Sequence, residues 1–163
     1  IPGTPGLTHR LGGLEKLAVS GNVSYIPENH QTMTDERQAK IDKIADFIPE
    51  QELHGNDDAD LLLIGWGGTF GHIHTAYEEL KAEGYNVAFT HFRYISPLPK
   101  NTEALLSKFA DKKMLIPEIN MGQFAKYLKM HYNDFHFEQL NKVQGLPFTV
   151  QEIKEKVIKL LDK

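Results

Sequence analysis

Two short stretches hold the side chains best placed to act on another molecule. Residues 93–99 read RYISPLP, and residues 118–123 read EINMGQ. Each follows an apolar run that predicts a β-strand, so both are expected at the carboxyl edge of one parallel sheet, where open α/β sheets place their functional surfaces. A purely structural role is the simpler alternative. Pro97 and Pro99 would stiffen a turn, Gly122 would permit a tight bend, and Glu118 or Asn120 would cap the next helix.

A glycine-rich turn, GWGGTFG at residues 65–71, lies between a predicted strand and a predicted helix. Dinucleotide and phosphate sites occupy such positions. The spacing is not G-x-G-x-x-G, because the last step is one residue too long, and no acidic residue ends the next strand to contact a ribose. The turn is therefore interpreted as a tight strand-to-helix connection. Trp66 would be costly to expose there, so we expect it to pack on another domain.

If the strands are parallel, the loops after them emerge at one edge, and their side chains should cluster on one face. Several are apolar, as is typical of a contact surface. We expect this face to bind the rest of a larger subunit or a second copy of it. The interface or support candidates at this edge are Trp66, Pro97, Leu98, Glu118, Asn120, Met121 and Gln123.

No catalytic, cofactor-binding or metal-ligating residue is predicted in this chain. His72 and His74 are two positions apart on a predicted helix, so they point in different directions. Neither H-E-x-x-H nor H-x₃-H occurs, and a G-x-S-x-G nucleophile elbow is missing too. The sequence contains no cysteine, which excludes thiolate chemistry and iron–sulfur ligation by this chain.

Composition narrows the class of partner. The chain has 163 residues and a net charge of −4, with no Lys/Arg cluster, which argues against nucleic acid and anionic membranes as partners. Neither a membrane-spanning apolar run nor a signal peptide is recognisable. With the lack of cysteine, these features favour a cytoplasmic protein. The loop-like start at Ile1-Pro2-Gly3 suggests a piece excised from a longer chain.

The first 58 residues are predicted to form a strap and linker. Residues 1–30 are too rich in glycine and proline to hold regular structure by propensity, so they are expected to be extended. Residues 32–48 predict a helix because Ile41, Ile44 and Ile48 share a helical face, and Pro49 would end it. Residues 51–58 predict a polar hinge.

Residues 59–163 are predicted to form one α/β domain. Strands and helices alternate with short loops, which indicates a three-layer, mostly parallel, doubly wound sheet. Thr149 and Glu152 form a capping box that opens the last helix. The expected strands are 61–64, 86–92, 114–118 and 135–143, and the expected helices are 72–83, 102–110, 123–131 and one from 149 onward.

These motifs resemble the C-terminal domain of the alpha subunit of 2-oxoacid:ferredoxin oxidoreductases, a relative of the transketolase C-terminal domain. The resemblance covers the whole chain. In the domain it rests on 65–71, 81–85, 97–99 and 118–123, and in the strap on 3–7, 9–15, 21–25 and 27–30. The strap is most similar to the 2-oxoglutarate branch. His9 and Arg10, within it, are further interface or support candidates.

The resemblance implies that the whole enzyme decarboxylates a 2-oxoacid oxidatively, with CoA, to an acyl-CoA and CO₂. It further implies that thiamine diphosphate and Mg²⁺ perform the carbon chemistry, that an iron–sulfur cluster passes electrons to ferredoxin, and that a beta subunit holds these groups. An upstream alpha-subunit domain would meet the thiamine pyrimidine. The present chain would then be a structural and assembly domain, inactive alone.

Two other functions stay open on the sequence. The same domain occurs at the C-terminus of pyruvate-dehydrogenase-type beta subunits and of transketolase, although no counterpart of the strap segment 9–15 is known there. The other is a stand-alone nucleotide-binding module. The lack of an acidic residue at the end of the second predicted strand argues against it. Within the resemblance, 2-oxoglutarate is favoured only by the strap, and pyruvate and branched-chain 2-oxoacids remain alternatives. The sequence likewise leaves open whether the chain dimerises alone.

Overall fold

A computed structural model describes residues 3–8 and 12–162 of the chain. It divides into two compact units, Ile1–Ile44 and Ala45–Lys163. His9 and Arg10, two of the candidates from the strap, lie outside the described residues. The domain boundary predicted between residues 58 and 59 stays a prediction, because a compact unit is not by itself an independently folding domain.

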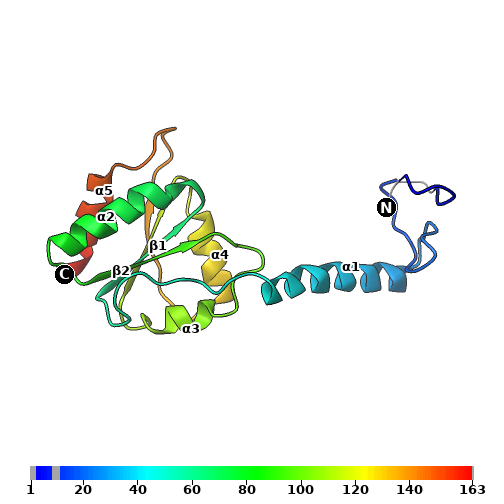
Figure 1. The fold of residues 1–163 in the computed structure, drawn as a ribbon, viewed down its shortest axis with the longest axis horizontal. Coiled ribbons are helices and arrows are strands. Elements are labelled where there is room, and N and C mark those ends of the chain that lie inside the picture. Colours follow the sequence, from blue (N-terminus) through cyan, green and yellow to red (C-terminus); the bar gives the residue numbers. More distant parts are fainter. Residues whose placement is uncertain (1–2, 9–11, 163) are drawn as a thin grey trace. The chain divides into compact units, whose positions relative to one another are not determined.

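The second unit contains a four-stranded sheet in which every strand is parallel to its neighbours (Figure 1). The strands are β1 (Leu61–Trp66), β2 (Val87–Phe92), β3 (Lys113–Glu118) and β4 (Glu138–Asn141), in the order β2-β1-β3-β4. β1 is buried along its first five residues, as expected of a strand covered on both faces. The predicted parallel α/β fold is thus confirmed.

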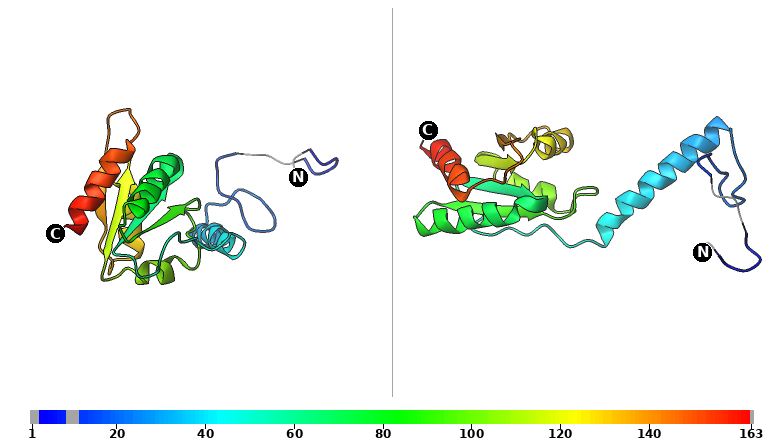
Figure 2. Two further views of the ribbon diagram at one scale, coloured as in Figure 1. Left: turned by 60° about the vertical axis from the view of Figure 1, so that its left-hand side comes forward. Right: turned by 90° about the horizontal axis from the view of Figure 1, so that it is seen from above.

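Helices cover both faces of this sheet, giving three layers (Figures 1 and 2). α2 (Phe70–Ala82) and α5 (Val150–Leu161) pack on one face and share a core with the side chains of that face. α3 (Thr102–Ser107) and α4 (Gln123–His131) pack on the other face. Since α2 follows β1 and α4 follows β3, the two central strands send their connections to opposite faces.

A segment before β1 covers the outer edge of β2. His54 and Phe89 exchange two backbone hydrogen bonds of 2.8 Å in an antiparallel bridge. The buried Gln51 side chain donates from Nε2 to the Thr90 hydroxyl at 2.7 Å. Residues 51–54 were predicted as part of a polar hinge. They instead satisfy hydrogen-bonding groups of a strand that would otherwise be an open edge.

The helix predicted at residues 32–48 is displaced. α1 spans Pro27–Asp42, and a 3₁₀ turn, η1, follows at Lys43–Asp46. It begins earlier because Pro27 occupies the first turn, where its fixed φ suits a helix and its missing N–H costs nothing. The isoleucine stripe that suggested the later position is not a core face, since α1 and η1 bury no residue.

The strap of the first unit is not extended throughout. Lys16 and Val23 form an antiparallel bridge, and the Ser24 amide donates to the Glu15 carbonyl at 2.9 Å. Asn29 Nδ2, from α1, donates to the Lys16 carbonyl at 3.0 Å and ties this small turn to the helix. Side-chain and backbone hydrogen bonds, rather than apolar burial, define the shape of this segment.

Candidate functional site

The carboxyl ends of all four strands lie at one edge of the sheet, and the loops that follow them form the candidate site. β1 and β3 are neighbours at the centre of the sheet, and their connections leave toward opposite faces. This is the topological switch point, where open α/β sheets form a crevice. The two motifs singled out in the sequence flank it, GWGGTFG after β1 and EINMGQ around the end of β3.

Glu118, the last residue of β3, organises this edge. It is fully buried, and its two carboxylate oxygens accept the Phe124 amide at 2.8 Å and the Ala125 amide at 3.0 Å. Both amides lie in the first turn of α4, where N–H groups lack partners within the helix and a negative charge is favourable. Oε1 also accepts from Trp66 Nε1 and from Asn120 Nδ2, each at 3.1 Å.

The loop between Glu118 and α4 is fixed by two further residues. Asn120 Oδ1 accepts the Gln123 amide at 2.8 Å, so Glu118 and Asn120 both cap α4, as predicted. Gly122 has a φ of +77°, and a Cβ atom there would lie 2.0 Å from Gln139 Oε1. A side chain at this positive φ would be strained, so the bend favours glycine, in agreement with the expected tight turn.

Trp66 is half-buried and packs inside its own unit. Its ring lies 5.6 Å from that of Phe124, and its N–H is held by Glu118. The indole finds these partners on β3 and α4, and the packing of its remaining exposed surface on another domain stays a prediction. Leu98 is also half-buried and packs on the same core cluster, and Pro97 beside it is half-buried.

The structure therefore separates the seven candidates at this edge into three groups, one of which is the half-buried pair Pro97 and Leu98. Trp66, Glu118 and Asn120 form one hydrogen-bonded group, to which the Gln123 amide is linked. Met121 and Gln123 have exposed side chains. Of these candidates, only Met121 is a large apolar side chain presented to solvent, at 71% exposure.

Sequence reasoning missed most of the apolar surface at this edge. Eight large hydrophobic residues are exposed in the described part of the second unit, and six of them lie within five residues of a strand's carboxyl end. These six, named here the carboxyl-edge face, are Phe70, Tyr94, Ile119, Met121, Val143 and Leu146. An apolar residue just beyond a strand, off the helical core pattern, is the signal that could have identified them.

A pocket of 190 Å³ opens at the switch point itself. Its lining comes from the loop after β1 and the loop after β3: Trp66, Gly67, Gly68, Thr69, Ile119 and Asn120. Neither Gly67 nor Gly68 would bring a Cβ atom within 4 Å of another group, so the glycines leave this wall open.

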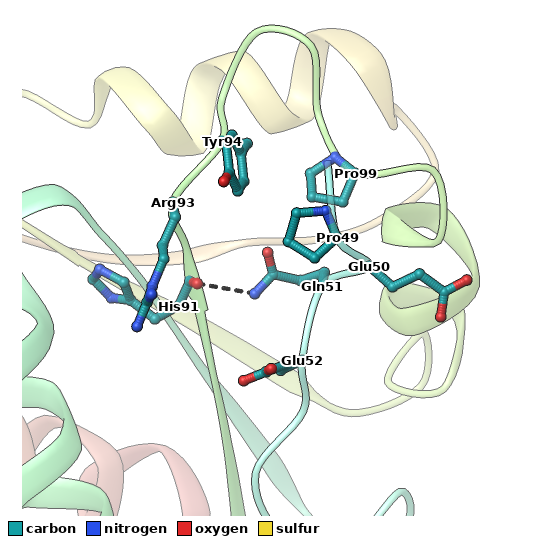
Figure 3. A pocket seen from close by; sticks show the side chains of 8 residues that line it. All are labelled: Pro49, Glu50, Gln51, Glu52, His91, Arg93, Tyr94 and Pro99. Carbon is teal, nitrogen blue, oxygen red and sulfur yellow. Dashed lines mark hydrogen bonds between the residues drawn. The ribbon is translucent and has the colours of Figure 1, made fainter. Parts of the chain in front are cut away.

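A second hollow, of 140 Å³, lies at the end of β2 (Figure 3). It is lined by Pro49, Glu50, Gln51, Glu52, His91, Arg93, Tyr94 and Pro99. Burial lowers the pKa of His91, the Arg93 charge adds to the effect, and a 3.2 Å hydrogen bond to the Gly67 carbonyl opposes it. The neutral imidazole donates in that bond. Gln51 donates to the His91 carbonyl at 3.0 Å and holds the wall together (Figure 3).

Within residues 3–8 and 12–162, no set of three or more His, Asp or Glu side chains is placed to hold a metal ion. The carboxylate of Glu118 is occupied by four donors. In that same part of the chain, no helix is long and apolar enough to cross a membrane.

Comparison with known proteins gives consistent relatives, although no protein-family model matches the chain. The 2-oxoglutarate oxidoreductase subunit KorA of Mycobacterium tuberculosis is 44% identical over 154 residues, covering 94% of this chain and 23% of that protein. The alpha subunit of 2-oxoacid:ferredoxin oxidoreductase 1 of Aeropyrum pernix is 31% identical over 146 residues, covering 86% and 23%.

A solved structure agrees with these sequence relatives. The 2-oxoglutarate:ferredoxin oxidoreductase of Magnetococcus marinus, determined with 2-oxoglutarate, coenzyme A and succinyl-CoA bound, matches 98% of this chain at a TM-score of 0.83 and 30% identity. The match covers 28% of that chain, and the present chain spans about a quarter of the length of its curated relatives. The chain belongs to the family of 2-oxoacid:ferredoxin oxidoreductase alpha subunits.

Proposed function

We propose that this chain is the assembly domain of the alpha subunit of a 2-oxoglutarate:ferredoxin oxidoreductase. The whole enzyme would convert 2-oxoglutarate and CoA to succinyl-CoA and CO₂ and pass the electrons to ferredoxin. The 44% identity to a subunit named for 2-oxoglutarate supports this substrate over pyruvate and branched-chain 2-oxoacids. The solved relative with 2-oxoglutarate and succinyl-CoA bound supports the same choice.

The cofactors of the whole enzyme would lie outside this chain. Thiamine diphosphate, Mg²⁺ and an iron–sulfur cluster would be held by the beta subunit, and the rest of the alpha subunit would complete the thiamine site. The side chains of this chain support that division. It has no cysteine to ligate a cluster, and the Glu118 carboxylate already accepts hydrogen bonds from groups within the domain. The cysteine-free composition is also consistent with a cytoplasmic location.

The carboxyl-edge face carries the proposal for this chain. Exposed apolar side chains are ordinary when scattered, but a group gathered on one rim indicates a contact surface. Here they follow the ends of all four strands, from Phe70 after β1 to Leu146 after β4. We assign this face to contact with the rest of the alpha subunit, since the relatives' chains are about four times as long.

Met121 and Met130 allow a matched test of this face. Both are 71% exposed, but Met121 lies just after β3, whereas Met130 lies near the C-terminal end of α4. The chain would be mixed with the separately produced remainder of the alpha subunit and the dissociation constant measured by calorimetry. Met121→Asp should weaken binding at least about tenfold, since a buried apolar anchor typically contributes more than 1 kcal/mol. Met130→Asp should bind as the unchanged chain does.

Equal affinities of the two variants would reject the face as the contact surface. Met121 is chosen over Leu98 because Leu98 packs on the core, so an aspartate there would act on folding as well as on binding. Thermal unfolding of both methionine variants provides the control for stability.

A further inference from the structure

The pocket at the switch point combines two properties that are unusual together. It lies in the crevice where open α/β sheets place polar ligands, yet its polar side chains are already bonded to one another. The Trp66 N–H donates to Glu118, and the Thr69 hydroxyl donates to the Trp66 carbonyl at 2.7 Å. Asn120 uses its amide nitrogen on Glu118 and its oxygen on the Gln123 amide.

A ligand with phosphates or carboxylates would therefore find few side-chain donors in this pocket, since these bonds leave over only the second N–H of Asn120 Nδ2. What the lining does present is the indole of Trp66, the side chain of Ile119 and the bare backbone of Gly67 and Gly68. Such a surface favours an apolar group, because burying a polar group without a partner costs free energy. Two further exposed apolar residues adjoin the lining in the sequence: Phe70 follows Thr69 at the start of α2, and Met121 follows Asn120 on the loop after β3.

We propose that the switch-point pocket receives one apolar side chain, such as Leu, Met or Phe, from the remainder of the alpha subunit. This inference rests on the proposed assembly function and names the contact at its centre. Two observations support this occupant. About three quarters of the Mycobacterium tuberculosis and Aeropyrum pernix polypeptides lies outside the matched region, and the pocket shares Ile119 with the carboxyl-edge face. Interface anchors typically fill preformed pockets at the centre of a contact.

Two glycines provide a matched pair of variants. Gly68 lines the pocket, has no positive φ, and would bring no Cβ atom within 4 Å of another group. A leucine there adds bulk at the pocket wall without strain in the backbone. Gly71, one turn along in α2, has the same freedom but does not line the pocket. Gly68→Leu should weaken association with the remainder of the alpha subunit at least tenfold, and Gly71→Leu should leave it within twofold.

The single tryptophan adds an independent signal. Trp66 is the only tryptophan of the chain, so its indole N–H gives one resonance in an NMR spectrum of the ¹⁵N-labelled protein. That resonance should shift when the partner is added to the unchanged chain or to Gly71→Leu, because the pocket fills beside the ring. With Gly68→Leu it should keep its free position at the same partner concentration.

The possible results separate this inference from the function on which it rests. If Gly68→Leu binds as tightly as Gly71→Leu and the Trp66 signal does not move, the pocket has no occupant and the inference is overturned. A loss of binding in Met121→Asp would then still support the carboxyl-edge face. If the unchanged chain does not associate with a remainder that circular dichroism shows to be folded, both are overturned.

Discussion

At the scale of single residues, Glu118 links the end of β3 to the start of α4 and to the Trp66 indole. Glu118 ends a strand at the functional edge of the sheet, the position from which many α/β enzymes present a reactive carboxylate. Its side chain is fully buried, and its four hydrogen bonds hold the first turn of α4, Asn120 and Trp66 in place. A buried carboxylate is tolerated when all its lone pairs find donors, and two backbone amides at a helix start are suitable donors.

Glu118→Gln tests this role. The amide keeps the size of the side chain but turns one acceptor into a donor, which would then face an amide N–H or the indole N–H. Leaving buried donors unpaired at such a site should lower the free energy of unfolding by about 2–4 kcal/mol. Urea unfolding would measure the change. Glu103→Gln, on the exposed first turn of α3, is the control and should change stability by less than about 0.5 kcal/mol.

A small effect of Glu118→Gln, comparable to that of the control, would show that the carboxylate charge is not what holds this edge. Other contacts would then have to hold the loop after β3, which carries Ile119 and Met121 of the carboxyl-edge face.

At the scale of elements, the sequence predicted those strands and helices whose position depends on local residue patterns. The continuous apolar run predicted β1, and α4 begins and ends where its pattern predicted, at Gln123 and His131. The first helix was misplaced because Ile41, Ile44 and Ile48 follow helical spacing without being buried, and burial depends on a partner surface that sequence periodicity does not reveal. The sequence located the candidate site at the carboxyl edge of the sheet, but it did not show which side chains there are exposed. Whether Leu98 is packed or Met121 exposed depends on tertiary contacts.

The capping box of α5 is an element whose energetics can be tested directly. The Glu152 amide donates to the Thr149 hydroxyl oxygen, and Glu152 accepts from the Thr149 amide at 2.7 Å. Thr149→Ala should lower the free energy of unfolding by about 1 kcal/mol at pH 7, the usual cost of losing such a cap. Thr75→Ala, at an exposed position inside α2, is the control and should not destabilise the protein.

Acid should remove the contribution of Glu152. Hydrogen bonds from Lys142 and from the Thr149 amide lower the pKa of Glu152 from 4.5 to about 2. A carboxyl whose pKa is lower in the folded state stabilises the fold above its unfolded pKa and loses this contribution as the pH falls through the folded value. The stabilisation should thus decline between pH 4.5 and about 2, and Glu152→Gln should show a flatter dependence in urea unfolding over that range. If the free energy of unfolding fell equally steeply with pH in Glu152→Gln and in the unchanged chain, the contribution assigned to Glu152 would be contradicted.

At the scale of the whole molecule, the two units differ in what holds them. The second unit has an apolar core on each face of its sheet. Among the described residues of the first unit only Ser24 is buried, while Tyr25 is 82% exposed and Leu7 67%. Even so, the match to the relatives covers 94% of the chain and so reaches into the strap. A segment with defined turns but no core needs a surface from another part of the protein to repay its ordering entropy.

Hydrogen exchange can show where that surface comes from. In the free chain, amides of the strap and of α1 should exchange quickly, because a 16-residue helix that buries nothing is marginal in water. Amides of β1 and β3, at the centre of the sheet, should be the slowest, since they open only with the whole unit. Adding the remainder of the alpha subunit should slow exchange in the strap and α1 and leave the central strands unchanged. Strong protection of α1 in the free, monomeric chain would mean that the first unit is stable by itself. The strap would then be a rigid part of this chain, not a segment that is ordered by assembly.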